Sequence, residues 1–401
     1  MTDGSPVRSE RKVIGDPVTI ADVARPRLDS VDQLRGLVMV LMVLDHVRDY
    51  FQIARINPND PASAGAGLFL TRWVTHFCAP VFVALAGSSI FLARSRGGSR
   101  HDQAVFLLTR GLWLLLLEVT LVKLEMTFNL SYRMVLLQVI WAIGLSMIAM
   151  SVMIFLPVPV VGALGLTFVA GHNLLGTAAL GPLGSWAGLF RPRPISGPWF
   201  GAFLAYPPVP WFGVLACGYG FGPALLLPPR RRRAVLVGAG MALILAFVAL
   251  RWSNGYGEPK KWTAATTPTI TVLSFLNCTK YPPSLLFVLM TLGPATLALV
   301  WFDGTPGWLG RRLIVFGRVP LFFYLLQWPL AHGLGVLLAW GLGRPGGWYF
   351  AGAPFNAPVG YGYGLPVVYL IWAVVVASLY PLSRWYAGVK RRSREPWLSY
   401  L

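Results

Sequence analysis

Four of the chain's five histidines fall in apolar stretches, where an ionisable side chain is costly. They are His46, His76, His172 and His332, and only His101 lies in a polar segment. A histidine inside a membrane-spanning helix is a candidate functional group, because imidazole takes up and releases a proton near neutral pH. Counted along their helices, all four are expected in the outer half of the bilayer. This common depth predicts one outward-facing pocket; four separate histidines with local hydrogen bonds are the alternative.

Charged side chains surround the first histidine in the segment LDHVRDYF. Asp45 and Asp49 lie four residues apart on one helix face, and Arg48 is placed to form an ion pair with Asp45. A carboxylate beside His46 raises its basicity and fixes its tautomer, which suits a general base. The candidate catalytic residues are therefore His46, His76, Asp45, Asp49 and Arg48. An interfacial charge cluster at a helix end is the alternative interpretation.

Other polar groups extend this set. Asn173, Tyr324 and Gln327 add hydrogen-bonding groups near two of the histidines, so the candidate substrate-binding residues are His172, Asn173, Tyr324, Gln327 and His332. Glu118 lies in the middle of an apolar run and needs a partner, for which Arg110 or a histidine is available.

A metal site is not expected. Zinc needs three or four ligands at short range, often spaced i, i+4 on one helix. No two of the four histidines share a predicted helix, and the chain contains no HExxH motif. The three cysteines, Cys78, Cys217 and Cys278, form no CxxC pair and are read as packing residues rather than a disulfide.

The elements that must position these residues are membrane helices. The chain has 401 residues, of which 55% are hydrophobic and 12% charged, against roughly 25% charged in an average soluble domain. Long apolar runs predict an all-α, polytopic transmembrane helix bundle with about ten spans. The predicted spans are 32–52, 69–93, 104–125, 134–156, 158–175, 208–227, 234–251, 282–302, 313–342 and 364–386.

The positions of Lys and Arg predict the orientation of the bundle. With the N-terminus inside, the inner segments carry 18 basic residues and the longer outer segments carry 8. We therefore expect a polar cytoplasmic tail (1–31), a transmembrane domain (32–386) and a basic cytoplasmic tail (387–401). The outer loops 176–207 and 252–281 are the connections long enough to build a substrate mouth.

Charge and targeting signals indicate the partners and the location. The formal net charge is +19, but the basic residues cluster beside apolar runs, which favours membrane topology over nucleic-acid binding. The first span is expected to act as an uncleaved targeting signal for a multi-pass protein of the inner (plasma) membrane. The lipid bilayer is the expected partner, and a homodimer is left open.

Several segments carry a family resemblance. RLDSVDQLRGLVMVLMVLDHVRDYF, THFCAPVFVALAGSSIFL and TKYPPSLLFVLMTLGP resemble the DUF1624 group, which is related to the catalytic domain of heparan-alpha-glucosaminide N-acetyltransferase. Membrane sugar O-acyltransferases also begin with a D-x-L-R-G helix and have a functional histidine fourteen residues after the Asp. Asp32 and His46 have that spacing. In the N-acetyltransferases the catalytic histidine precedes the second helix; residues 53–70 here contain none, and His76 is the nearest substitute.

The resemblance implies a function. The chain is expected to move an acetyl or other acyl group from cytoplasmic acetyl-CoA or another acyl-CoA to an acceptor on the far side, either a glycan or another hydroxyl or amine compound. Arg35, Arg96 and Arg110 are the expected contacts for CoA phosphates. His46 or His76 would deprotonate the acceptor, and Arg48 would stabilise the developing oxyanion.

Two other functions use the same residues. A proton-coupled transporter or flippase also places His and Asp inside a bundle, with broken helices and inverted repeats. No internal repeat is visible in this sequence, which favours the acyltransferase. A structural or accessory membrane protein is the third alternative.

Overall fold

The computed structural model describes residues 28–53, 56–175, 181–351, 353–393 and 395–400. Most of them lie in helices. The main helices are α1 (Asp29–Phe51), α2 (Pro61–Thr75), α3 (Cys78–Arg94), α4 (Arg100–Leu117), α5 (Lys123–Thr127), α6 (Val139–Met153), α7 (Val158–Gly171), α9 (Pro208–Leu225), α10 (Pro229–Ser253), α11 (Pro268–Leu276), α12 (Leu285–Trp301), α13 (Trp308–Arg318), α14 (Pro320–Gly341) and α15 (Leu365–Arg392).

Short elements complete the chain. A π-helical segment, η2 (Glu118–Val122), joins α4 to α5. The 3-10 segments are η3 (His172–Leu174), η4 (Gly181–Leu189), η5 (Gly347–Phe350) and η6 (Pro396–Tyr400), and the strands are β1 (Val135–Leu137), β2 (Arg193–Ser196) and β3 (Gly201–Leu204). The predicted polar tail, 1–31, lies almost wholly outside the described residues.

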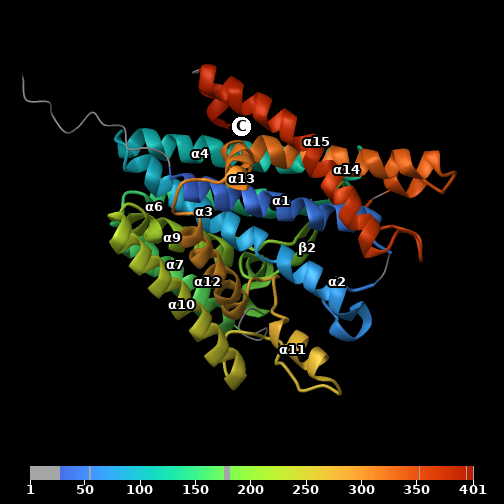
Figure 1. The fold of residues 1–401 in the computed structure, drawn as a ribbon, viewed down its shortest axis with the longest axis horizontal. Helices are drawn as coiled ribbons and strands as arrows, with labels where there is room; N and C mark the ends of the chain where they lie inside the picture. Colours follow the sequence, from blue (N-terminus) through green and yellow to red (C-terminus); the bar gives the residue numbers. More distant parts are fainter. Residues whose placement is uncertain (1–27, 54–55, 176–180, 352, 394, 401) are drawn as a thin grey trace, which may run out of the picture.

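Helix α1 lies in the middle of the bundle. The helices α4, α14 and α15 lie on one side of it, and α7, α9, α10 and α12 lie on the other (Figure 1). Its side chains are buried all around the helix, including Met39, Val43, Val47 and Phe51 at 0% exposure. No residue of α1 is exposed, so the polar residues near its end are also carried into the core of the protein.

Close helix contacts depend on glycine. At the α1–α13 crossing, a Cβ added to Gly36 would lie 2.0 Å from the carbonyl oxygen of Leu313, and one on Gly317 would lie 1.9 Å from that of Asp32. Membrane helices associate by backbone approach and dispersion, since lipid is as apolar as their side chains. The same two-sided glycine contacts join α3 with α9, α4 with α6, α7 with α9 and α10 with α12; the residues are Gly87, Gly218, Gly111, Gly144, Gly165, Gly213, Gly240 and Gly293.

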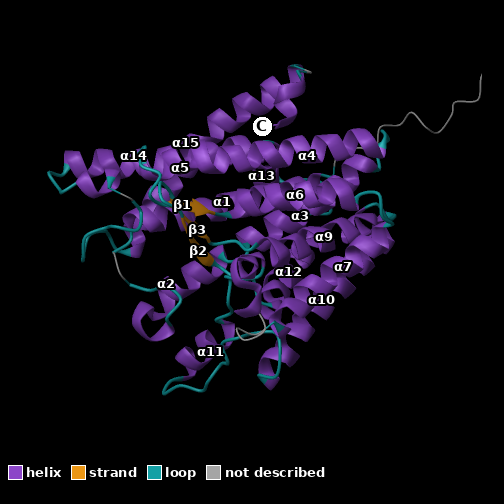
Figure 2. Cartoon of the chain, turned by 180° about the vertical axis from the view of Figure 1, so that it is seen from behind, coloured by secondary structure: helices purple, strands orange, loops and turns teal. Residues whose placement is uncertain are grey.

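A small sheet lies near the end of α1 (Figure 2). Its strand order is β1-β3-β2; β1 pairs with β3 in parallel and β2 pairs with β3 antiparallel. The all-α prediction was therefore too strict, and the chain is mostly helical. Strand β1 was assigned to the span 134–156 because a short apolar run does not distinguish a strand from a helix.

All ten predicted spans fall on helices, with corrected boundaries. Among the residues that the structure describes, five helical stretches are long and apolar enough to cross a membrane: 61–94, 100–127, 229–253, 320–341 and 365–392. The predicted span 313–342 consists of two helices, because the helix is interrupted at Val319, between the end of α13 and Pro320 at the start of α14. Ten crossings and two cytoplasmic ends stay predictions.

The last helix extends into the predicted basic tail, 387–401. Helix α15 continues to Arg392, and Leu398 is buried against Val319 and Tyr386. The end of the chain thus packs beside the junction of α13 and α14.

The glycine contacts give a stability prediction. Replacing Gly36 by Ala forces α1 away from α13, because backbone carbonyls cannot move aside as side chains do. We expect the variant to lose about 1–3 kcal/mol of unfolding free energy and to melt at lower temperature in detergent, as measured by a thermal-shift assay.

Gly238 provides the matched control. It lies on α10, and an added Cβ would meet nothing within 4 Å. Gly238→Ala should leave the melting temperature unchanged or slightly higher. Equal melting of the two variants would contradict the tight α1–α13 contact.

Candidate functional site

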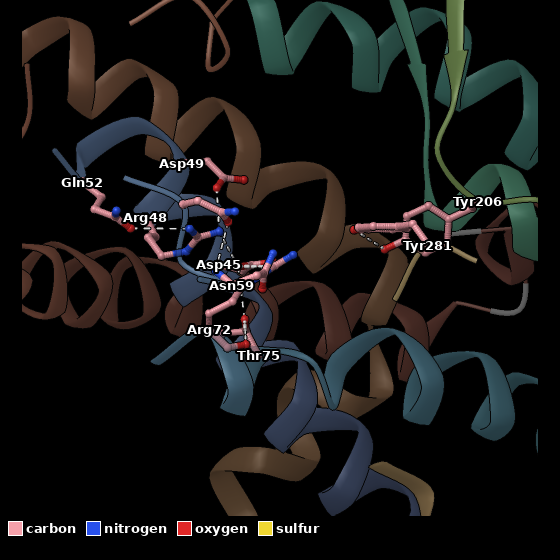
Figure 3. Close-up of polar contacts among 10 residues, drawn as sticks. Asp45, Arg48, Asp49, Gln52, Asn59, Arg72, Thr75, Tyr206 and Tyr281 are labelled. Carbon is pink, nitrogen blue, oxygen red and sulfur yellow. Dashed lines mark hydrogen bonds and ion pairs between the residues drawn. The ribbon is translucent and has the colours of Figure 1, made fainter. Parts of the chain in front are cut away.

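The carboxylate of Asp45 is the centre of an ion cluster formed by α1 and α2 (Figure 3). Arg48 Nη2 donates to Asp45 Oδ1 at 2.9 Å and to Asp49 Oδ1 at 2.8 Å. From α2, Arg72 Nη1 binds both carboxylate oxygens of Asp45, and the Thr75 hydroxyl donates to Oδ1 at 3.1 Å. The negative charge of Asp45 is therefore balanced in place, and the expected Asp45–Arg48 ion pair is confirmed.

His46 lies next to this cluster and packs against α14. Its ring stacks on Trp328 with the centroids 3.8 Å apart, and Tyr324 meets it edge-on at 6.4 Å. Within the described part of the chain no carboxylate hydrogen-bonds the imidazole; the oxygens of Asp45 and Asp49 bind arginines instead. The carboxylate expected to orient His46 is thus bound to Arg48 instead of to the imidazole.

Unpartnered polar atoms gather around His46. Gln327 is 0% exposed, and neither its Oε1 nor its Nε2 has a hydrogen-bond partner among the described residues. The same is true of His46 Nδ1 and Trp328 Nε1. Each unpaired buried polar atom costs free energy. These groups on two facing helices are therefore available to hydrogen-bond a molecule beside His46.

A cavity of about 870 Å³ opens beside these residues, here called the His46 cavity. Four predicted catalytic residues line it: Asp45, His46, Arg48 and Asp49. Its walls also include Tyr206 from the outer loop 176–207, and Lys280 and Tyr281 around the end of the loop 252–281. The two connections that are long enough to build a substrate mouth thus both contribute to this wall.

The polar cavity residues that sequence reasoning missed include Arg72, Tyr206, Lys280 and Tyr281. Arg72 could have been found, because it is a charge inside the predicted span 69–93. Lys280 and Tyr281 belong to the KYPPS segment, which was used only for the family resemblance. Tyr206 gave no signal, because a tyrosine in an outer loop is ordinary.

The partly buried carboxylate of Glu258 fixes the turn that carries Lys280. Glu258 accepts hydrogen bonds from the backbone N–H of Thr279 at 2.9 Å, from the Thr279 hydroxyl, and from the Ser284 hydroxyl at 2.6 Å. Ser284 also caps α12 by accepting from the N–H of Phe287 at 3.0 Å. The turn between Thr279 and Ser284 is held at both ends, which fixes Lys280 relative to the cavity.

The prediction that four histidines share one pocket is wrong, because only His46 lines the cavity. His332 Nδ1 lies 3.1 Å from the carbonyl oxygen of Glu125, and its Nε2 lies 3.0 Å from that of Tyr349. Its ring stacks on Phe128 at 3.8 Å. His332 therefore joins α14, α5 and the following loop. A common depth in the bilayer does not determine the direction in which each histidine side chain points.

The other two histidines also have local surroundings. His172 Nδ1 lies 3.1 Å from the carbonyl oxygens of Phe168 and Val169 at the end of α7. His76 is buried at the junction of α2 and α3 and meets Phe287 edge-on at 5.5 Å. Neither lines either of the cavities described here.

The predicted substrate-binding set is accordingly divided. Tyr324 lines the His46 cavity and Gln327 lies beside His46. Asn173 Oδ1 instead accepts from the N–H of Leu285 at 2.9 Å, which supports the first turn of α12. His172, Asn173 and His332 are thus placed in structural contacts.

A second cavity, of about 590 Å³, lies where α1 begins, α3 ends and α4 begins; we call it the basic cavity. All three predicted CoA-binding arginines line it: Arg35, Arg96 and Arg110. Arg94, Arg318 and Lys390 also line it, against the two carboxylates of Asp32 and Asp102. An excess of cations makes this cavity suitable for phosphate groups.

The two cavities meet inside the bundle. Phe82 and Tyr324 line both of them. Along α1, Arg35 and His46 are eleven residues apart, a rise of about 16 Å. Two aromatic side chains thus form the boundary between a basic compartment and a compartment that contains the candidate base.

Glu118 has a different partner from the one expected. Its Oε1 accepts from the N–H of Gln138 at 2.8 Å, just before α6 begins. A carboxylate at a helix N-terminus satisfies free N–H groups and complements the helix dipole. Glu118 therefore caps α6 and pairs with neither Arg110 nor a histidine.

No group of three or more His, Cys, Asp or Glu side chains suited to a metal ion occurs in the part of the chain that the structure describes.

Comparison with known proteins gives the family. The family described as "Heparan-alpha-glucosaminide N-acetyltransferase, catalytic" matches residues 27–253, more than half of the chain. The match contains the Asp45 ion cluster, His46 and the three predicted CoA-binding arginines, Arg35, Arg96 and Arg110. No curated protein matches the chain. The extent of the family match shows that the chain belongs to the heparan-alpha-glucosaminide N-acetyltransferase catalytic-domain family.

Proposed function

We propose that this protein is a membrane-embedded acyltransferase. It takes an acetyl or other acyl group from acyl-CoA in the basic cavity and transfers it to a hydroxyl or amine acceptor in the His46 cavity. The observation that carries the proposal is the pair of cavities along α1, one lined by arginines and the other by His46, which share Phe82 and Tyr324.

The basic cavity fits the donor. CoA carries several phosphate charges, and arginine binds phosphate oxygens with two parallel hydrogen bonds. The boundary near His46 fits the reacting end, because His46 Nδ1 and the Gln327 amide have no partner among the described residues. An apolar boundary also limits hydrolysis of the thioester by water.

His46 is the proposed general base. The acceptor oxygen or nitrogen forms a bond to the acyl carbonyl carbon and gives its proton to His46, while the carbon–sulfur bond breaks and the thiol of CoA is released. The stacked ring of Trp328 limits the imidazole to one orientation. The Asp45–Arg48–Arg72 cluster holds α2 beside His46. Arg48, two residues from His46 on α1, is the guanidinium proposed to stabilise the developing oxyanion.

The direction of transfer follows from the proposed topology. The basic cavity contains the start of α1, which the distribution of Lys and Arg predicts to be cytoplasmic. The donor thus comes from the cytoplasm, and a glycan or other small acceptor enters from the opposite side. The protein belongs on this proposal to the inner (plasma) membrane as a multi-pass protein.

The first test of the proposal uses the base. With purified protein, labelled acetyl-CoA and a panel of sugar and amine acceptors, His46→Ala should lower the rate of acceptor-dependent CoA release by about 10²–10⁴-fold. His101→Ala, which changes an exposed histidine on α4, is the matched control and should keep the wild-type rate. Equal rates for His46→Ala and wild type would show that His46 is not the base.

The second test uses the basic cavity. Arg96→Gln removes a cation from the cavity wall, and a charge-assisted hydrogen bond is worth roughly 1.5–3 kcal/mol. We expect the KM for acetyl-CoA to rise about tenfold or more, with a smaller change in kcat. Arg230→Gln, at the exposed start of α10 and outside the cavity, serves as the control. If both variants have the same KM, CoA binds elsewhere.

A further inference from the structure

The His46 cavity contains one cation more than its carboxylates can balance. Its charged lining residues are Asp45 and Asp49 against Arg48, Arg72 and Lys280. The two aspartates are bound by the two arginines. Lys280 is therefore the surplus positive charge.

Lys280 is buried without a carboxylate beside it. It is 8% exposed, and within the described residues no Asp or Glu lies within ion-pair distance of its ammonium group. The internal stretches that the structure leaves undescribed, 54–55, 176–180 and 352, contain no Asp or Glu. A buried charge that lacks a counter-charge destabilises the protein, so such a residue needs a compensating anion.

The surroundings of Lys280 suit a ligand. Its ammonium lies 5.1 Å from the ring centre of Tyr281 and 6.0 Å from that of Tyr206. These cation–π contacts stabilise the charge only in part. The two tyrosine hydroxyls are 3.5 Å apart, and Figure 3 shows them turned towards the Asp45 cluster. An ammonium and two hydroxyls lining one cavity can all bind the oxygens of a carboxylate or phosphate.

The position of Lys280 is fixed by groups that do not face the cavity. Glu258 binds Thr279 on one side of the turn and Ser284 on the other. Arg251 holds the preceding segment by donating to the carbonyl oxygens of Phe275 and Asn277. A binding group on a turn held at both ends is already in place before the ligand arrives, which reduces the entropy cost of binding.

We propose that Lys280, with Tyr206 and Tyr281, forms a subsite that selects acceptors bearing a carboxylate or phosphate group. One part of this inference rests on the proposed function: while Lys280 holds the anionic group of the acceptor, a hydroxyl or amine on the same molecule reaches His46 and is acylated. The anion subsite itself is testable without any transfer.

Binding is measured first, on the full purified protein in detergent. Glucuronate and glucose are compared by thermal shift at equal ionic strength, for wild type, Lys280→Gln and Lys280→Arg. Glucuronate should raise the melting temperature of the wild type more than glucose does. Lys280→Gln should lose this difference and Lys280→Arg should keep it, because only the arginine retains the charge. An unchanged difference in Lys280→Gln would overturn the proposal.

The ligand-free proteins give a second readout. Without ligand, Lys280→Gln should melt at the same or a higher temperature than wild type, because the surplus buried charge is removed. A merely structural lysine predicts the opposite. A lower melting temperature combined with an unchanged glucuronate shift would assign Lys280 to folding and contradict the subsite.

Transfer is measured with matched acceptors: glucose against glucuronate, and glycerol against glycerol 3-phosphate. Lys280→Gln should raise the KM for the charged member of each pair about 10- to 100-fold and leave the neutral member unchanged. An equal fall in kcat for both members would make Lys280 an oxyanion stabiliser, and the selection would be wrong.

Nanodiscs of phosphatidylglycerol and of phosphatidylcholine, each without added acceptor, show whether a lipid headgroup supplies the phosphate.

The two proposals fail differently. Lys280-dependent glucuronate binding without CoA release would refute acyl transfer and leave the anion subsite standing. CoA release that depends on His46 but is equal for charged and neutral acceptors would refute the subsite and leave acyl transfer standing.

Discussion

A carboxylate inside an apolar helix bundle is stable only if cations neutralise it, and Asp45 sets this constraint for the whole site. It binds Arg48 on its own helix and Arg72 on α2. This pairing fixes α2 against α1 and brings Thr75 into the same cluster. It also pairs both arginines with carboxylates, so Lys280 is the cation of the cavity lining that has no ion pair among the described residues. One buried acid thus determines both the geometry of the wall and the charge of the space in front of it.

Close helix packing allows this arrangement to exist beside large cavities. Glycines bring backbone against backbone at the α1–α13 and α3–α9 crossings, where dispersion over many atoms replaces the hydrophobic driving force that lipid does not provide. The α1–α13 crossing uses Gly36 of α1, which precedes Asp45 on the same helix. The bundle is therefore firm where helices cross and open where loops contribute Tyr206, Lys280 and Tyr281. A cavity bounded by fixed helices keeps its polar groups in place without a ligand.

The sequence predicted the helices well and the site in part, for identifiable reasons. Apolar runs and the positions of Lys and Arg located every helix that could cross a membrane, and charges inside those runs located Asp45, His46 and the arginines of the basic cavity. The prediction that four histidines share one pocket failed because the position of a residue along a helix gives its depth in the membrane but not the direction of its side chain. His332, for example, faces the carbonyl oxygens of Glu125 and Tyr349. Glu118 capping α6 and Lys280 entering from a loop depend on contacts between distant segments, which no local pattern encodes.

On the proposed function, the aromatic boundary between the cavities gives a reason for the position of His46. A thioester next to a general base and water would be hydrolysed, so a transferase has to keep water away from the reacting carbonyl. Tyr324 and Phe82 line both cavities, and Tyr324 meets the His46 ring edge-on. His46 thus stands on the acceptor side of an apolar partition, where the acceptor's own hydroxyl or amine can displace water from the imidazole. The unpartnered amide of Gln327 and the buried Nδ1 of His46 lie at this partition, which is the place where a bound acceptor gains hydrogen bonds that the empty bundle leaves unmade.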